Sequence, residues 1–357
     1  MYSDEKRGIA LAIGWAFIGT GRHPDSRVAP AMVLAEDTEI IAAYSRDQQR
    51  ADAFATKHGA RAAYTSVEAL LDDSRVDAVF IASPNHLHAP YTKLAAQAGK
   101  HVLVEKPLST TASEGLEMIK ACRAHGVKLG VGFQLRFHPG HMEARRLVQQ
   151  GALGDIALAQ ALLGSGVRGE VRRQPRTGLS AWWEDPHMVG NSMAMIGSGV
   201  HAVDDLEFIL GQTVLEIAAL TDGQSAMAPL EHLATMSLRF SGGAIGMVCC
   251  GSRMPDAKND VTIYGSDGRV LLEECSRPFL GGSLEVSSET VNSTESYPPD
   301  PLALSKWQIE GFNRAISLDE EPRASGIDGL RSVQVTEAMI ESAKTRRTVN
   351  VEPIHVT

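Results

Sequence analysis

The chain has 357 residues, of which 43% are hydrophobic and 22% charged, and its formal net charge at pH 7 is −9. These values are ordinary for a soluble globular protein with enough chain for two domains or one large one. The acidic excess argues against a nucleic-acid or anionic-membrane surface. The 4 cysteines lack CxxC or zinc spacing, which indicates reduced thiols in a cytoplasmic protein.

An apolar run from Ile9 to Ile18 follows two basic residues and superficially resembles a signal peptide. It continues into Gly19 without a small-residue cleavage site, so we expect a core strand instead of a targeting segment. We also expect no membrane-spanning segment, because no later stretch is long and apolar enough.

The predicted strand Ile13–Ile18 is followed by a glycine turn that is typical of dinucleotide binding, although such a turn alone also occurs in ordinary loops. The first glycine permits a tight turn, and the second lets the backbone approach a pyrophosphate at a helix N-terminus. The residues of this turn are Gly19, Thr20, Gly21 and Arg22. Pro24 stands where a third small residue is usual, and a helix is predicted from about Ser26 to Leu34.

The next strand, Glu39–Tyr44, ends in Ser45 and Arg46 at the position where a Rossmann fold meets the adenosine ribose. A hydroxyl and a guanidinium suit a 2′-phosphate better than the carboxylate that usually binds a 2′-hydroxyl. NADP is therefore favoured over NAD, unless both residues are only a solvated strand end. Asp47 is predicted to cap the helix Gln48–His58.

A further strand, Asp77–Ala82, also leads into polar residues, which are Ser83, Pro84 and Asn85. Asn85 is predicted to cap the following helix. His88 lies on the first turn of that helix, near the expected cofactor face, where structural and functional roles are equally open.

The strand His101–Val104 is central to the interpretation, because it breaks at Pro107, which lacks the N–H of a sheet ladder. Glu105 and Lys106 therefore stand at the carboxyl end of a strand, where open α/β sheets bind ligands. An amine there can move protons if burial or a nearby cation lowers its pKa. Strands that alternate with helices to residue 133 predict a parallel sheet.

Beyond Phe133 the pattern changes to closely spaced strands with hairpin turns, which predicts a mostly antiparallel sheet. The strands are predicted at 156–163, 214–220, 233–240, 244–250, 261–264 and 270–272, and helices at 141–150, 305–317 and 326–344. The polar stretch 283–296 is interpreted as a mobile loop or a sheet edge.

One helix of this second part, Gly197–Leu210, carries His201 with Asp204 and Asp205 on the same face. A carboxylate beside an imidazole fixes its tautomer and raises its pKa, which suits acid–base chemistry. A capping or packing histidine is the equally open alternative. No further ligands at metal spacing are present, so no metal site is predicted.

Taken together, the ordered motifs resemble the glucose–fructose oxidoreductase and inositol 2-dehydrogenase (Gfo/Idh/MocA) family over essentially the whole chain. The motifs are Gly-x-Gly, Ser83-Pro84-Asn85-x-x-His88, Glu105-Lys106-Pro107, Arg136-Phe-x-Pro139 and Gly199-Val-His201-x-x-Asp204.

This resemblance implies an α/β fold with an N-terminal Rossmann domain, here 1–130, and a C-terminal α/β domain with a large, mostly antiparallel open sheet, here 131–357. The last segment is expected to be able to return to the first domain. The resemblance also implies a homodimer or homotetramer formed through that sheet. The activity it implies is hydride transfer between NAD(P) and a hydroxyl or carbonyl carbon of a sugar, polyol or cyclic diol.

By resemblance, Lys106 is the catalytic acid–base and His201 the second acid–base or substrate-orienting residue, and Pro107 follows a cis peptide. The expected cofactor-binding residues are Gly19, Thr20, Gly21, Arg22, Ser45, Arg46, Ser83, Pro84, Asn85, His88, Glu105, Lys106 and Arg136. The expected substrate-binding residues are Lys106, Arg136, Trp182, Trp183, His201 and Asp204.

The chain departs from the family pattern at two places. Gly197 occupies the position of the usual aspartate four residues before the histidine, so Asp204, Asp205 or Glu184 supplies the charge, or Lys106 and His201 act without one. The glycine loop also has one additional residue near Pro24.

Two other functions stay open beside the sugar or polyol oxidoreductase. One is an NAD(P)-sensing regulatory protein without turnover, and the other is a dehydrogenase of an aromatic dihydrodiol. A purely structural protein has no need for these glycines and strand-end polar groups.

Overall fold

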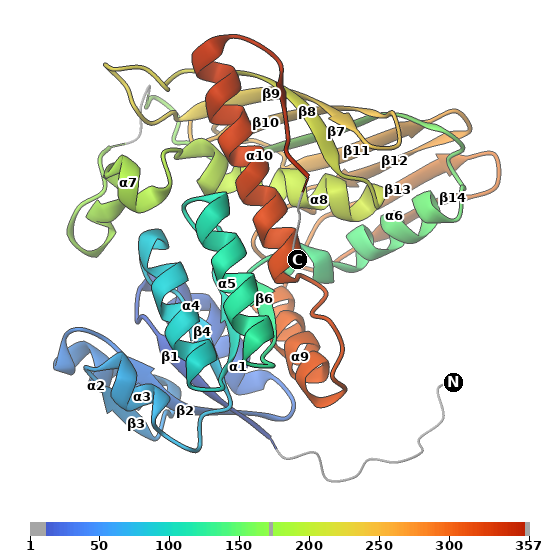
Figure 1. Cartoon of the computed structure of the whole chain (residues 1–357). Helices are drawn as coiled ribbons and strands as arrows, with labels where there is room; N and C mark the ends of the chain where they lie inside the picture. The colour runs from blue at the N-terminus through green and yellow to red at the C-terminus, as the bar shows by residue number, and fades with distance from the viewer. Residues whose placement is uncertain (1–11, 171–173, 354–357) are drawn as a thin grey trace.

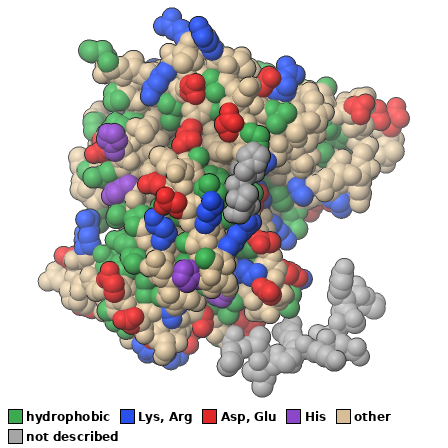
Figure 2. Space-filling view, viewed as in Figure 1, with side chains coloured by type: hydrophobic (Ala, Val, Ile, Leu, Met, Phe, Trp, Pro, Cys, Tyr) green, Lys and Arg blue, Asp and Glu red, His purple; other side chains and the backbone are tan. Residues whose placement is uncertain are grey.

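The computed structural model describes residues 12–170 and 174–353, which form two sheets joined by helices (Figure 1). The first three residues of the apolar run from Ile9 to Ile18 lie outside the described residues, and Ile13–Ile18 form the first strand. Among the described residues, no helix has the length and apolar character to cross a membrane. Acidic and basic side chains are interspersed over the face seen in Figure 2.

Sheet A has six strands in the order β3-β2-β1-β4-β5-β6, and every neighbouring pair is parallel. This is the Rossmann order, in which the order of successive strands reverses between β1 and β4 and leaves a ligand-binding crevice there. The strands are β1 (Ile13–Ile18), β2 (Thr38–Tyr44), β3 (Ala62–Tyr64), β4 (Ala78–Ile81), β5 (His101–Val104) and β6 (Leu129–Val131). The predicted parallel sheet is confirmed.

Helices cover both faces of sheet A, which explains why its strands are continuous apolar runs. Trp15 and Phe17 point into one cluster, with side chains of α1, α2 and α9. Ala16 and Ile18 point into the other, with side chains of α3, α4 and α5. The helices are α1 (Ala29–Leu34), α2 (Gln48–His58), α3 (Val67–Leu71), α4 (His88–Gln97), α5 (Ala112–Ala124) and α9 (Ala303–Ser317).

Two local predictions in this half are wrong. The helix expected from about Ser26 begins at residue 22 and opens with a π-helical turn, η1 (Pro24–Val28), because a π turn accommodates one additional residue inside a helix. Asn85 does not cap α4, because its side chain donates to the carbonyl of Val189 (3.0 Å) in the C-terminal half. The predicted cap of α2 is confirmed, since the Asp47 carboxylate accepts the N–H of Arg50.

Sheet B has nine strands, and all of its pairings are antiparallel except that between β7 and β10. The strands are β7 (Ile156–Gly164), β8 (Val214–Thr221), β9 (Leu233–Phe240), β10 (Ile245–Gly251), β11 (Asp260–Gly265), β12 (Gly268–Glu273), β13 (Ser283–Ser288), β14 (Asn292–Ser296) and β15 (Val349–Asn350). The large, mostly antiparallel sheet is confirmed. The polar stretch 283–296 is the hairpin β13–β14 at one edge of the sheet, so it is an edge and not a loop.

One face of sheet B is covered by helices, which are α6 (Pro139–Gln149), α8 (Val200–Leu210) and α10 (Gly326–Thr345) (Figure 1). The opposite face exposes Leu162, Leu220, Ile245, Met247 and Tyr264. The family resemblance implies that copies of the chain associate through this sheet, and that association stays a prediction.

The last part of the chain returns to sheet A. On α9, the Asn313 side-chain oxygen accepts the indole N–H of Trp15 (3.0 Å), and Gln308 donates to the carbonyl of Val131 (2.9 Å). The N–H of Val131 donates to the carbonyl of Ala324 (2.9 Å), just before α10. The two halves are therefore held together by buried contacts as well as by the chain crossing between them.

A buried ion pair connects the same elements. Arg136, on the short helix η3 (Gln134–Phe137) that follows β6, contacts the carboxylate of Asp204 on α8 at 2.7 Å and that of Asp328 on α10 at 3.0 Å. Its guanidinium also donates to the carbonyl of Arg323 (2.8 Å) and lies over the Phe208 ring. Arg136 and Asp204 are both nearly inaccessible to solvent, so neither charge has water as an alternative partner.

We predict that Asp204→Ala lowers the free energy of unfolding by about 3 kcal/mol, because it leaves a buried guanidinium without its main partner. Chemical denaturation measures this loss. The matched control is Glu216→Ala, which removes the partner of Arg239 from an exposed pair and should cost less than about 1 kcal/mol. Equal losses in the two variants would contradict the structural role assigned to Asp204.

Candidate active site

Lys106 lies just beyond the carboxyl end of β5 and reaches into the C-terminal half. Its ammonium donates to the carbonyl oxygens of Ile196 (2.7 Å) and Gly197 (3.1 Å). Both carbonyls belong to η5 (Met195–Gly199), a π-helical turn that leads directly into α8. The peptide between Lys106 and Pro107 is cis, as the resemblance implied.

This position changes the acidity of the amine. Burial lowers the pKa of Lys106 to about 8, the carboxylate of Glu105 acts in the opposite direction, and the guanidinium of Arg176 lowers it further. An amine with a pKa near 8 is present in both protonation states around neutral pH. It can therefore serve as a proton donor or acceptor, which an ordinary lysine with a pKa near 10.5 does poorly.

The carboxylate beside Lys106 has a partner that the sequence interpretation missed. His23 Nε2 lies 3.0 Å from Glu105 Oε1, and the Glu105 side chain is only 17% exposed. Glu105 raises the pKa of His23. Burial opposes ionisation of Glu105, but the charges of His23 and Lys106 leave its pKa below the usual value. No sequence spacing indicates this pair, because the two residues come from separate elements.

His201 stands on the first turn of α8 and completes a cluster with Glu105 and Lys106. Burial and the positive charge of Lys106 lower its pKa to about 3, so the imidazole is neutral near pH 7. Its ring packs edge-to-face on Phe133 (6.0 Å between centroids). Its Nδ1 is buried and has no hydrogen-bond partner among the described residues.

The predicted carboxylate partners of His201 are occupied elsewhere. Asp204 binds Arg136, and Asp205 accepts a hydrogen bond from Ser276 and lies 3.3 Å from His141. Glu184 accepts the backbone N–H of Arg176. The prediction that Asp204 or Asp205 raises the pKa of His201 is therefore wrong. The helix turns Asp204 toward the buried guanidinium of Arg136, and Asp205 toward Ser276 and His141.

At Gly197 the chain contributes backbone instead of a carboxylate. Its carbonyl accepts from Lys106, and a Cβ atom built at this position would meet no heavy atom within 4 Å. The carboxylate that acts on Lys106 and His201 is Glu105, which comes from the other half of the chain.

The glycine loop has the geometry that a dinucleotide requires. Gly19 has a φ of 116°, and a Cβ atom there would lie 2.6 Å from the carbonyl oxygen of Ala82, so only glycine fits. A Cβ atom at Gly21 would meet nothing within 4 Å, so the backbone is open to a ligand on that side. The helix begins at Arg22, and its first N–H groups lie next to this opening. The residues present fit a pyrophosphate, with Thr20 between the two glycines.

At the end of β2, Ser45 is buried and Arg46 is exposed. The Ser45 hydroxyl accepts the N–H of Asp47 (3.3 Å). The charge of Arg46 acts on Tyr91 of α4, whose ring packs edge-to-face on Tyr44. A guanidinium is thus presented beside the crevice of sheet A.

The residues after β4 brace the site. His88 is fully buried, and its two ring nitrogens lie 2.8 Å from the carbonyl oxygen of Pro107 and 3.1 Å from that of Ser83. It therefore connects the loop after β4 to the loop that carries Lys106, and its ring is not available to a cofactor. Asn85 holds Val189, as described above, and the Ser83 hydroxyl lies near the carbonyl of Pro84 (3.4 Å).

Residues 174–190 lie against these two loops. Gly190 approaches Thr110, and the helix α7 (Pro186–Val189) contacts the turn η2 (Asn85–Leu87). Trp182 and Trp183 are half-buried with ring centroids 4.9 Å apart, and Arg176 lies 3.9 Å over the Trp183 ring. The charge of Arg176 also reaches Lys106, so this segment borders the site.

The structure thus brings together Lys106, His201 and Glu105 and adds His23. It places Arg136 and Asp204 in a separate buried network, where their charged groups bind each other. We therefore assign these two residues to the junction between the halves and not to a wall of the candidate site.

Comparison with known proteins agrees with this architecture. Residues 13–133 match the model of the oxidoreductase family with an NAD-binding Rossmann fold, GFO/IDH/MocA, and residues 141–271 match a GFO/IDH/MocA C-terminal domain. Among solved structures, the aldose–aldose oxidoreductase of Caulobacter crescentus, complexed with glycerol, is similar in fold. Its TM-score is 0.82 at 24% identity, with 95% of this chain and 99% of that chain covered.

Curated relatives are similar over most of the chain. A D-xylose 1-dehydrogenase (NADP(+)) of Haloferax volcanii is 30% identical, with 95% of this chain and 99% of the relative covered. A 1,5-anhydro-D-fructose reductase of Ensifer adhaerens is 28% identical, covering 95% and 98%. A trans-1,2-dihydrobenzene-1,2-diol dehydrogenase of Mus musculus is 28% identical, covering 82% of each. The chain belongs to the GFO/IDH/MocA family of NAD(P)-dependent oxidoreductases.

Proposed function

We propose that the protein is a dehydrogenase or reductase that interconverts a hydroxyl and a carbonyl carbon of a sugar or polyol, with Lys106 as the acid–base. The observation that carries the proposal is the placement of Lys106, whose lowered pKa and contact with η5 put a titrating amine between the two halves. When bound, the nicotinamide ring supplies the acceptor or donor of hydride. The names of the Haloferax and Ensifer relatives support a sugar as the substrate class.

The residues divide the proton chemistry between them. In the oxidation direction, the neutral amine of Lys106 accepts the hydroxyl proton, and in the reduction direction its ammonium returns one to the carbonyl oxygen. His201 is neutral near pH 7, so it orients the substrate oxygen by a hydrogen bond and does not carry a charge. Glu105, paired with His23, stabilises the ammonium form of Lys106 and so keeps its pKa from falling further.

The segment 174–190 suggests a second candidate substrate. Two adjacent tryptophan rings at the border of the site would also suit a flat cyclic substrate, and the mouse relative is named for an aromatic dihydrodiol. A substrate panel with NAD or NADP that includes polyols, aldoses and trans-dihydrobenzenediol distinguishes the two, with nicotinamide absorbance as the readout. Cofactor binding without turnover of any of them would favour the sensor that the sequence left open.

We predict that Lys106→Met lowers kcat by about 10²–10⁴-fold, because the acid–base group is lost, while the dissociation constant of the cofactor changes little. Steady-state kinetics and cofactor titration measure the two effects. Lys120→Met, on the exposed face of α5, is the matched control and should leave both unchanged. Turnover at the wild-type rate in the Lys106 variant would exclude its acid–base role.

The pH dependence should follow the pKa of Lys106. Oxidation requires the neutral amine, so kcat/KM should rise with pH and level off above about 8, whereas for reduction it should fall over the same range. Because Glu105 raises this pKa, Glu105→Gln should shift the midpoint of the oxidation profile to lower pH. Glu117→Gln, in an exposed pair with Lys93, is the control and should leave the midpoint in place. A shift to higher pH in Glu105→Gln would be inconsistent with the proposed electrostatics.

We further propose that NADP is preferred over NAD, because Ser45 and Arg46 directly follow β2, at the position where the 2′-phosphate of NADP would lie. Arg46→Ala should weaken NADP binding by about tenfold or more and NAD binding hardly at all, since charge-assisted hydrogen bonds are worth about 1.5–3 kcal/mol. Isothermal titration with both cofactors measures this, and Arg50→Ala on the neighbouring helix is the control. Equal weakening of both cofactors would defeat the assignment.

A further inference from the structure

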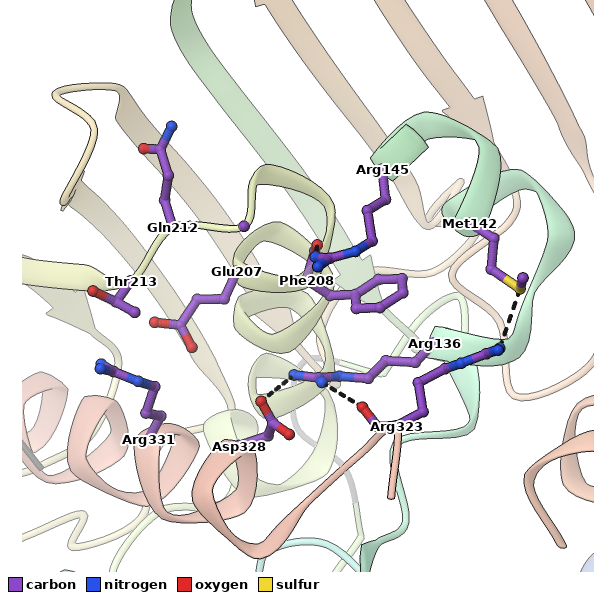
Figure 3. Close-up of a pocket in the computed structure, with 11 residues that line it drawn as sticks. Arg136, Met142, Arg145, Glu207, Phe208, Gln212, Thr213, Arg323, Asp328 and Arg331 are labelled. Atoms are coloured by element: carbon purple, nitrogen blue, oxygen red, sulfur yellow. Dashed lines mark hydrogen bonds and ion pairs between the residues drawn. The ribbon is translucent and has the colours of Figure 1, made fainter. Parts of the chain in front are cut away.

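A cavity lies at the far end of α8, away from the turn that contacts Lys106. Its volume is about 510 Å³, which is within the range of small-molecule sites. Glu207 and Phe208 of α8 border it, together with Arg145 of α6, Arg323 before α10, and Arg331 of α10 (Figure 3). His201 and Phe208 are about 10 Å apart along the helix axis, at 1.5 Å per residue.

The cavity is positively charged although the whole chain has a net charge of −9. Four arginines border it against two carboxylates, and one of these, Asp328, is already bound to Arg136 and to Ser325. The other, Glu207, accepts the N–H of Val214, and its burial raises its pKa to about 7, so it is only partly ionised near neutral pH. The cavity lining therefore carries a net positive charge.

Three of the four guanidinium groups have no carboxylate bound to them among the described residues. Arg145 donates to the backbone carbonyl of Phe208 and lies over the Phe208 ring (4.8 Å). Arg323 contacts the sulfur of Met142 (3.3 Å), a weak acceptor. Arg331 makes no ion pair within the described ranges, and its charge acts on Glu207.

We propose that this cavity is a binding site for a phosphate-bearing anion, distinct from the candidate active site and independent of the function proposed above. A planar guanidinium group can donate two parallel hydrogen bonds to two oxygens of one phosphate. Figure 3 shows the guanidinium groups of Arg145 and Arg331 approaching the cavity from separate helices. Thr213 also lines the cavity, and its hydroxyl offers a further donor. Chloride, which has no oxygen acceptors, fits this arrangement less well.

The test is isothermal titration calorimetry of the full chain with inorganic pyrophosphate, orthophosphate and glucose 6-phosphate. The ionic strength is kept constant with a chloride salt, so chloride is the competing anion. Arg145→Gln and Arg331→Gln should each weaken binding by about tenfold or more, and Arg331→Lys should weaken it less because the charge is kept. Arg168→Gln, which alters an exposed arginine elsewhere, is the control. Tight binding of the inorganic ions would indicate a free phosphate ligand, and preference for the sugar phosphate an organic one.

The glycine loop also offers a phosphate site, so the comparison between variants decides the outcome. Phosphate binding that is unchanged in Arg145→Gln and Arg331→Gln would belong to another site and would overturn the proposal. If the variants do not fold, hydrogen–deuterium exchange of the wild-type chain tests the proposal instead. Pyrophosphate should slow hydrogen–deuterium exchange in residues 207–213 and 323–331 of the wild-type chain, and exchange that is unaffected there would equally overturn it.

Discussion

The contact between the Lys106 ammonium and two carbonyl oxygens of η5 is the interaction on which the candidate site depends. It takes an amine from the edge of sheet A and buries it against the C-terminal half, and burial is the main reason that its pKa falls. The same contact holds η5 in place, and η5 leads directly into the helix that carries His201. This contact therefore aligns Lys106, the proposed acid–base group, with His201, which is proposed to orient the substrate.

The surrounding structure fixes the geometry of this contact. His88 connects the loops after β4 and β5, and Asn85 ties the first of them to Val189. One turn further along α8, the ion pair of Arg136 with Asp204 fixes the rotation of the helix and therefore the direction of His201. Residues that lie outside the reacting groups thus determine the geometry between them.

Much of this could be predicted from the sequence. The strands of sheet A are apolar runs that end in glycine, proline or polar residues, and their alternation with helices leaves few possible topologies. The position of Lys106 at the carboxyl end of a strand was predictable, because Pro107 ends that strand. The remaining features depend on tertiary contacts: packing brings the guanidinium of Arg136 against Asp204, so this carboxylate pairs with Arg136 and not with His201. His23 could not be assigned to Glu105 because nothing in their spacing brings the two together, and the π turn at Pro24–Val28 is an outcome of packing.

The central claim is that Lys106 is a partly neutral amine near physiological pH. The most direct measurement is a ¹³C NMR titration of lysine side chains, with the Lys106 resonance assigned by its absence in Lys106→Arg. The structure predicts a midpoint at about 8 for this resonance. A midpoint near the ordinary lysine value of 10.5 would contradict the account, because the amine would then be fully protonated wherever the protein works.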